Sequence, residues 1–279
     1  MKKMNKVKGS SKFGDIFQDK LLVILIVILI VMGIIIIVMS LVNRNNLDIN
    51  SDKVKELHNY FTTKDLGNCD GLFTYGEKEI TYADVDSENR LCLAYQKSDL
   101  KVEEELSIDA KKKTNLCTYE DGLVFRADEE TNKCTVSKIK KEIIDNTYKK
   151  LYGKDVENNE KFKVDNFTIC YLKGDYYYCG LSETFTYTLG NEAVIYRIVN
   201  KAEEKGSEVV IYDYFAKIND KTCFKTYTTT TVNENCTEEL KDIKEVNYKF
   251  LEKFGTKYKH VFKKADDGTY YWVSSTPVK

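Results

Sequence analysis

The chain has 279 residues, of which 31% are charged and 42% are hydrophobic, and its formal net charge is −1. A chain of nearly balanced charge lacks the basic surface that binds nucleic acid, so no nucleic-acid partner is expected. The length allows one large domain or two modest ones.

One apolar run dominates the N-terminal region. It begins at Leu21 and ends at Val42, and no charged residue interrupts it. At about 1.5 Å per residue, a helix over residues 21–42 is roughly 33 Å long, enough to cross a hydrocarbon core of about 30 Å. A buried core helix is the alternative, but a helix of a soluble protein usually has a polar face. The run therefore predicts a transmembrane helix, with the lipid bilayer as its partner.

The charges that flank this run predict its orientation. Residues 1–20 contain six lysines and two aspartates, a net charge of +4. An excess of lysine keeps its side of the membrane in the cytoplasm. A cleaved signal peptide is the alternative, but its apolar region usually has about 7–15 residues. We therefore expect a cytoplasmic basic tail at 1–20, an uncleaved single-pass anchor at 21–42 and an extracytoplasmic remainder at the cell membrane.

The placement of cysteine agrees with this topology, because all eight cysteines follow the apolar run. An even number of cysteines in the exported part is typical of disulfides formed in an oxidising compartment. Zinc is the alternative, but the chain has no Cys-x-x-Cys pair, the ligand spacing typical of structural zinc sites. Pairing of sequence neighbours is the simplest of about 105 connectivities. The neighbour pairs are Cys69–Cys92, Cys117–Cys134, Cys170–Cys179 and Cys223–Cys236.

Hairpin geometry supports the pairing of Cys170 with Cys179. Gly174 and Asp175 lie midway between these cysteines and can form a two-residue turn, in which glycine supplies a positive φ. Counting outward from the turn places Cys170 opposite Cys179 in a non-hydrogen-bonded pair. The Cα atoms of such a pair are about 4.5 Å apart, at the short end of the range for disulfides.

Apolar periodicity predicts short helices first and long strands later. The expected elements, in chain order, are helices at 52–62 and 86–97, a strand at 122–127, a helix at 137–152, strands at 166–171, 176–188, 193–202, 208–218 and 222–231, a helix at 238–254, and a closing hairpin of 257–264 and 269–275. Gly153 follows the helix at 137–152, at the position where a left-handed cap ends a helix.

Helices packed on one side of a curved antiparallel sheet predict an α+β roll, stapled by disulfides. The pattern from Ser137 onward resembles the nuclear-transport-factor-2-like (cystatin-like) rolls. The similar features are a helix that ends in Leu-Tyr-Gly, long hairpins and a closing Phe-Lys-Lys-x-Asp-Asp-Gly-x-Tyr-Tyr-x-Val. The chain also resembles uncharacterised single-pass membrane-anchored proteins of low-GC Gram-positive bacteria. The resemblance implies a roll at 136–279, which leaves 43–135 as a small membrane-proximal α+β subdomain.

Few residues suit catalysis. The two histidines are His58 and His260, and the chain has no His-Glu-x-x-His motif, Gly-x-Ser-x-Gly elbow or Gly-rich phosphate loop. We expect no catalytic, cofactor-binding or metal-ligating residues, and no cofactor.

The expected function is binding or interaction outside the membrane, with an envelope protein or a small ligand as partner. Two alternatives stay open. One is an extracytoplasmic enzyme that uses a roll cavity, with His260 and a nearby carboxylate as an acid/base pair. The other is a structural or assembly component of the cell envelope.

Overall fold

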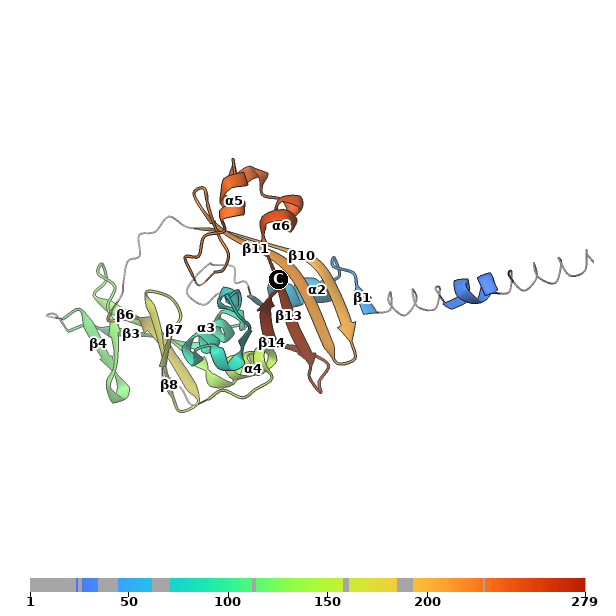
Figure 1. Cartoon of the computed structure of the whole chain (residues 1–279). Coiled ribbons are helices and arrows are strands. Elements are labelled where there is room, and N and C mark those ends of the chain that lie inside the picture. The colour runs from blue at the N-terminus through green and yellow to red at the C-terminus, as the bar shows by residue number, and fades with distance from the viewer. Residues whose placement is uncertain are drawn as a thin grey trace, which may run out of the picture. The chain divides into compact units, whose positions relative to one another are not determined.

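Figure 1 presents the computed structural model of the chain. The described residues are 24, 27–34, 45–61, 71–111, 114–157, 161–184, 193–227 and 229–278. Leu47–Lys279 forms one compact unit, and Met1–Asn46 forms a separate unit. Each unit is considered by itself below.

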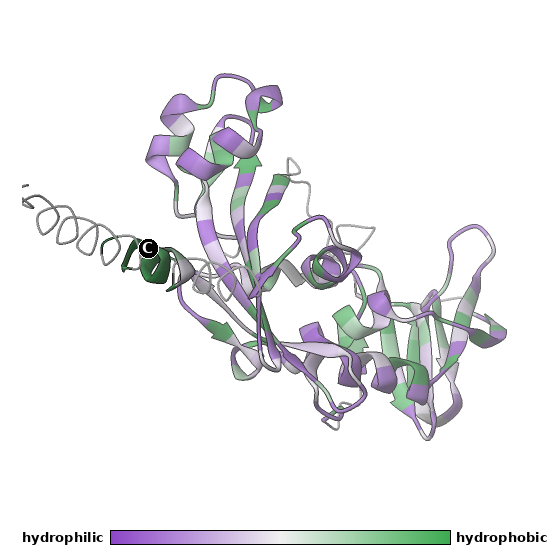
Figure 2. Ribbon diagram, turned by 90° about the vertical axis from the view of Figure 1, so that its right-hand side faces the viewer, coloured by the Kyte–Doolittle hydropathy of each residue, from purple (hydrophilic) through white to green (hydrophobic). Residues whose placement is uncertain are grey.

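Most of the expected anchor at 21–42 lies outside the described residues. Its described part at 27–34 is helical, and Figure 2 shows this segment in the green of hydrophobic residues. Within the described ranges, no helix has both the length and the apolar character needed to cross a membrane.

Within the described residues, the strands form two antiparallel sheets and a separate strand pair. The larger sheet contains β1 (Asn46–Leu47), β2 (Ile80–Thr81), β10 (Val194–Lys205), β11 (Glu208–Asn219), β12 (Thr222–Phe224), β13 (Thr256–Lys264) and β14 (Tyr270–Pro277). The smaller sheet contains β3 (Val102–Asp109), β6 (Lys133–Lys140), β7 (Lys161–Lys163), β8 (Thr168–Lys173) and β9 (Tyr176–Leu181). The separate pair is β4 (Leu116–Tyr119) and β5 (Leu123–Arg126).

The strand order shows how the sheets are connected. It is β1–β10–β11–β13–β14–β2 in the larger sheet, with β12 paired to β11, and β3–β6–β9–β8–β7 in the smaller one. The α+β class with antiparallel sheets is therefore as predicted. β2 pairs with β14, and β3 pairs with β6. Strands from both sides of the expected boundary at 135/136 thus share sheets within one compact unit.

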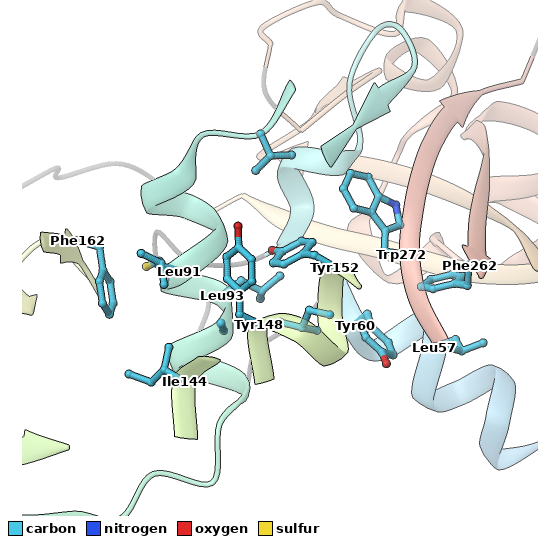
Figure 3. Close-up of a cluster of buried hydrophobic side chains, with 14 of the residues drawn as sticks. Leu57, Tyr60, Leu91, Leu93, Ile144, Tyr148, Tyr152, Phe162, Phe262 and Trp272 are labelled. Carbon is cyan, nitrogen blue, oxygen red and sulfur yellow. The ribbon is translucent and has the colours of Figure 1, made fainter. Parts of the chain in front are cut away.

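Two helices pack between the sheets, α3 (Ser87–Lys97) and α4 (Lys141–Tyr152). Their apolar side chains form one core with residues of both sheets. Figure 3 shows Tyr148 of α4 between Phe162 of the smaller sheet and Trp272 of the larger sheet. The interior is therefore a helical layer enclosed by two sheets.

The remaining described helical segments of the compact unit are shorter. They are α2 (Asp52–His58), α5 (Glu234–Glu239), α6 (Tyr248–Phe254) and the 3₁₀ turns Asn59–Phe61, Gly71–Thr74, Tyr82–Asp84, Glu120–Gly122 and Ile243–Glu245. The helices expected at 52–62 and 86–97 correspond to α2 with its following turn and to α3.

The helix expected at 137–152 begins later than predicted. Residues 137–140 belong to β6, which pairs with β3 on one side and with β9 on the other. Hydrogen bonds to two neighbouring strands stabilise the extended backbone there, which local helix propensity does not anticipate. The end of α4 is as predicted, because its cap Gly153 has a left-handed φ of 63°.

The helix expected at 238–254 is divided. The side chain of Asp242 accepts a hydrogen bond from the backbone N–H of Lys244, and that of Asn247 accepts one from Phe250. Each side chain caps the start of a new helical segment and so competes with a continuous helix. The strand expected at 222–231 is also shorter, because β12 ends at Phe224.

Three disulfides lie between described residues: Cys117–Cys134, Cys170–Cys179 and Cys223–Cys236. Each is a predicted neighbour pair. In the β8–β9 hairpin Cys170 faces Cys179 with the Cα atoms 4.1 Å apart, and Gly174 has φ 57°, as the hairpin geometry predicts. The fourth predicted pair involves Cys69, which lies outside the described residues, so Cys69–Cys92 stays a prediction.

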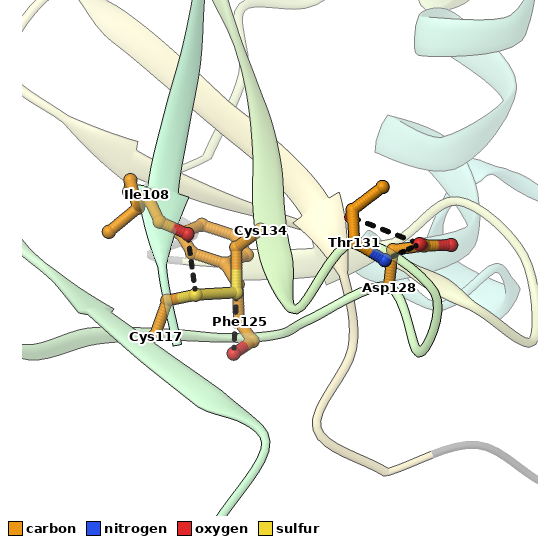
Figure 4. Close-up of a disulfide and its surroundings, with 6 residues drawn as sticks. All are labelled: Ile108, Cys117, Phe125, Asp128, Thr131 and Cys134. Atoms are coloured by element: carbon orange, nitrogen blue, oxygen red, sulfur yellow. Dashed lines mark hydrogen bonds between the residues drawn. A yellow bond between two sulfur atoms is a disulfide. The ribbon is translucent and has the colours of Figure 1, made fainter. Parts of the chain in front are cut away.

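The Cys117–Cys134 bridge fastens β4 to β6 (Figure 4). The sulfur of Cys117 lies 3.2 Å from the carbonyl oxygen of Ile108, and that of Cys134 lies 3.4 Å from the carbonyl oxygen of Phe125. Because a disulfide sulfur carries no hydrogen to donate, these are packing contacts. The bridge therefore holds the β4–β5 pair against the smaller sheet.

Two glycines with the same φ allow a test of how the end of α4 packs against β14. Gly153 and Gly206 both have φ 63°. A Cβ atom at Gly153 would lie 2.8 Å from the ring of Tyr271, whereas at Gly206 it would meet no described atom within 4 Å. We expect Gly206→Ala to lower the free energy of unfolding by about 1–2 kcal/mol, the cost of a left-handed residue with a side chain. Gly153→Ala should lower it further, because the ring must move. Urea unfolding followed by Trp272 fluorescence checks this, and equal losses would contradict the packing.

Candidate functional site

The two histidines of the chain lie on either side of one buried carboxylate. His58 ends α2, Asp213 lies in the middle of β11, and His260 lies in β13. Nε2 of His58 is 2.9 Å from Oδ2 of Asp213, and Nε2 of His260 is 3.0 Å from Oδ1. The side chains of Asp213 and His260 have no exposed surface, and that of His58 is 13% exposed. The fold therefore brings together residues that are far apart in the sequence.

Two further side chains complete this Asp213 cluster. Tyr75 donates its hydroxyl to Oδ2 of Asp213 at 2.5 Å, and Nε of Arg197 donates to the Tyr75 hydroxyl at 2.7 Å. Arg197 also donates to the backbone carbonyl of His58 at 2.7 Å. The guanidinium lies 3.9 Å from the carboxylate. Asp213 is thus surrounded by donors and positive charge, as a buried carboxylate requires.

The electrostatics of the cluster favour an ionised Asp213. Burial raises its pKa, but the charge and hydrogen bond of His260, with those of His58, outweigh burial and hold the pKa well below its ordinary value. Burial lowers the pKa of His58, and the charge of Arg197 lowers it further, against the opposing effect of Asp213. Burial raises the pKa of Tyr75 well above its ordinary value, so the phenol stays a donor.

Ser275, His260 and Asp213 have the composition of a catalytic triad. Nδ1 of His260 lies 2.6 Å from Oγ of Ser275, which also accepts a hydrogen bond from Nε1 of Trp272 at 2.9 Å. Because an ionised Asp213 can only accept, Nε2 of His260 donates to it. Neither Ser275 nor His260 has exposed surface, and a nucleophile must reach its substrate. The arrangement therefore connects strands and offers no accessible hydroxyl.

The larger cavities are lined by other residues. A cavity of about 610 Å³ lies beside the turn at Gly174, and one of about 320 Å³ lies beside Phe167 and Leu181. A third, of about 260 Å³, lies between α2, α3 and α4. His260 lines none of these three. The enzyme hypothesis requires a carboxylate beside His260 and a cavity around it; the carboxylate is that of Asp213, and none of these three cavities reaches His260.

A metal has no ready site in the described part of the chain. No group of three or more His, Cys, Asp or Glu side chains there could hold a metal ion. In the Asp213 cluster, the donors from Tyr75 and the nearby guanidinium of Arg197 occupy the surroundings of the carboxylate.

Comparison with known proteins gives no match: no protein-family model, curated protein or solved structure is significantly similar to this chain.

The sequence predicted a carboxylate beside His260 only under the enzyme alternative, and no pattern in it connected His58 with either residue. One signal was present. Asp213 interrupts the apolar segment Val-Val-Ile-Tyr-Asp-Tyr-Phe-Ala of a predicted strand. A carboxylate in a buried strand needs partners, and two histidines in a chain of this length are natural candidates.

Removal of the carboxylate tests how much the Asp213 cluster contributes to the stability of the fold. Asp213→Ala leaves the buried donors of His58, His260 and Tyr75 without their acceptor. We expect the free energy of unfolding to fall by about 3–5 kcal/mol. Asp266→Ala, at an exposed position in the β13–β14 turn, is the matched control and should change it little. Urea unfolding of the two variants measures the difference, and a small effect of Asp213→Ala would contradict this role.

The lowered pKa of His58 predicts a pH dependence of stability. Between its folded and unfolded pKa values, the unfolded chain binds more protons than the folded chain, so stability decreases as the pH falls. We expect this decrease as the pH falls below about 7, near the ordinary pKa of histidine and above the range in which most carboxylates titrate. His58→Gln keeps an amide donor for Asp213 but does not titrate, and should show a shallower decrease. Unfolding curves at several pH values check this, and equal slopes would exclude His58 as the cause.

Proposed function

We propose that this chain is a membrane-anchored domain that binds a ligand or a partner protein outside the cell membrane. In this proposal, residues 1–20 lie in the cytoplasm and residues 21–42 cross the bilayer as one helix. The compact unit lies on the outer side, and neither catalysis nor a cofactor is part of the proposal.

The observation that carries the proposal is the exposure of apolar side chains on a helical segment. Within 27–34, every residue except Gly33 is a large hydrophobic residue with 48% to 64% of its surface exposed. Exposed apolar surface costs about 25 cal/mol per Å² in water, but nothing comparable in hydrocarbon. A bilayer is the environment that suits such a helix, and the lysines of residues 1–20 favour a cytoplasmic N-terminus.

The disulfides support an outer location for the compact unit. Cys117–Cys134, Cys170–Cys179 and Cys223–Cys236 all lie within it. Disulfides persist in oxidising compartments and are rare in the cytosol.

The buried Asp213 cluster favours binding over catalysis. His260 is the histidine on which the enzyme alternative depends, and it has no exposed surface. A structural or assembly role in the cell envelope agrees with the same location outside the membrane. It differs from the proposed function only in the partner that the compact unit would bind.

We also propose that the roll resemblance applies to the larger sheet. α4 precedes the long β10–β11 and β13–β14 hairpins in the chain, and α4 packs against β14. The β8–β9 hairpin belongs to the smaller sheet and would be an addition to such a roll.

Membrane anchoring is tested by substitution within the exposed helical segment. We expect the full chain, produced in a bacterial host, to stay in the membrane pellet after alkaline carbonate extraction. The double variant Ile28→Arg and Met32→Arg should be released, because a charge near the centre of a bilayer costs about 2.5 kcal/mol or more. Ile28→Leu with Met32→Leu is the matched control and should stay in the pellet. Extraction of the unmodified chain would rule out the anchor.

The orientation of the chain in the membrane is tested in the same bacterial host. Protease added to intact protoplasts should degrade the compact unit and leave an N-terminal epitope tag protected. Protection of the compact unit would contradict its outer location.

A further inference from the structure

The cleft between α2, α3 and α4 is lined by residues outside the Asp213 cluster. The turn that follows α2 supplies Asn59 and Tyr60, α3 ends in Lys97, and α4 supplies Thr147 and Leu151. The cleft has a volume of about 260 Å³, which suits a molecule built on a single ring.

Lys97 lines this cleft and is partly buried. Its Nζ donates to the backbone carbonyl of Asn59 at 2.5 Å, so the amine is anchored to the end of α2. The apolar walls are nearly closed to solvent, because Tyr60 is 8% exposed and Leu151 is 4% exposed. An amine beside apolar walls is poorly hydrated, which disfavours its charged form.

The charge state of Lys97 changes accordingly. Burial, followed by the positive charge of Arg197, lowers the pKa of Lys97 to about 8. About a tenth or more of the amine is then unprotonated near neutral pH, against about one part in a thousand for an ordinary lysine. Desolvation and a neighbouring cation are the two means by which proteins turn lysine into a nucleophile for carbonyl compounds.

Lys150 provides a comparison within the same cleft. Its side chain is 51% exposed, and its Nζ lies 3.4 Å from a carboxylate oxygen of Glu56. Lys150 therefore lines the same cleft as Lys97 from an exposed position on α4.

We propose that this cleft binds a small aldehyde or ketone with an apolar body, and that Lys97 holds it as an imine. The lone pair of Nζ attacks the carbonyl carbon and a C–N bond forms. The two amine protons leave with the carbonyl oxygen as water, and the C=N bond results. No oxidant or reductant takes part. The inference goes beyond the proposed function, because it does not depend on the membrane anchor.

The test uses the full chain in detergent micelles with 4-carboxybenzaldehyde as the probe and cyanoborohydride to trap the imine. Peptide mapping by mass spectrometry then measures labelling at each lysine. At pH 7.5 we expect Lys97 to be labelled at least about tenfold faster than Lys150, because burial lowers the pKa of the Lys97 amine. The rate should saturate with probe concentration, and 4-methylbenzoate, which has no carbonyl group to condense, should compete.

Two variants and a denatured sample complete the design. Lys97→Arg keeps the positive charge and should abolish the fast labelling, whereas Lys150→Arg should leave labelling of Lys97 unchanged. In concentrated urea the two lysines of the unmodified chain should react at similar rates. Labelling of Lys97 no faster than Lys150 in the folded chain would overturn the proposal. A rate that rises linearly with probe concentration would overturn it too, because it would indicate a reactive lysine without a binding site.

Discussion

The arrangement of the larger sheet depends on the hydrogen bonds that the buried carboxylate of Asp213 accepts. Asp213 lies on β11, opposite Tyr258 of β13, and His260 lies opposite Ile211. Asp213 and His260 are thus diagonal neighbours on one face of the sheet, and a slip of one residue would turn one of them to the other face. A buried carboxylate without partners is costly. The register of β11 against β13 is therefore fixed by a polar requirement as well as by apolar packing.

The features that could be predicted from the sequence are those fixed by nearby residues. The turn at Gly174 determines that Cys170 faces Cys179, and the left-handed Gly153 ends α4. The expected helix start at 137 and the expected helix at 238–254 were wrong for opposite reasons. At 137–140, two neighbouring strands override helix propensity. At 238–254, the side chains of Asp242 and Asn247 cap new helical segments, although the apolar residues have the spacing of one helix. Apolar periodicity carries no information about capping.

The candidate sites were less predictable, because both depend on contacts between distant segments. His58 and His260 meet only after α2 has packed against the larger sheet, and no local pattern pairs them. Lys97 acquires its surroundings from Asn59 on one side and Leu151 on the other. In the sequence it is one lysine at the end of a helix, where lysine is ordinary because it complements the helix dipole. Lys97 differs from other lysines at helix ends because it lies where α2, α3 and α4 come together.

The Asp213 cluster also explains how so short a helix as α2 holds a defined position. A helix of seven residues is not stable alone, and only Val54 and Leu57 of α2 are buried. Their burial contributes about 1.5–3 kcal/mol each, but apolar contacts are non-directional and tolerate sliding. The hydrogen bonds from Arg197 to the carbonyl of His58, and between His58 and Asp213, fix one end of the helix. The apolar residues therefore hold α2 against the sheet, and the polar cluster determines where it lies.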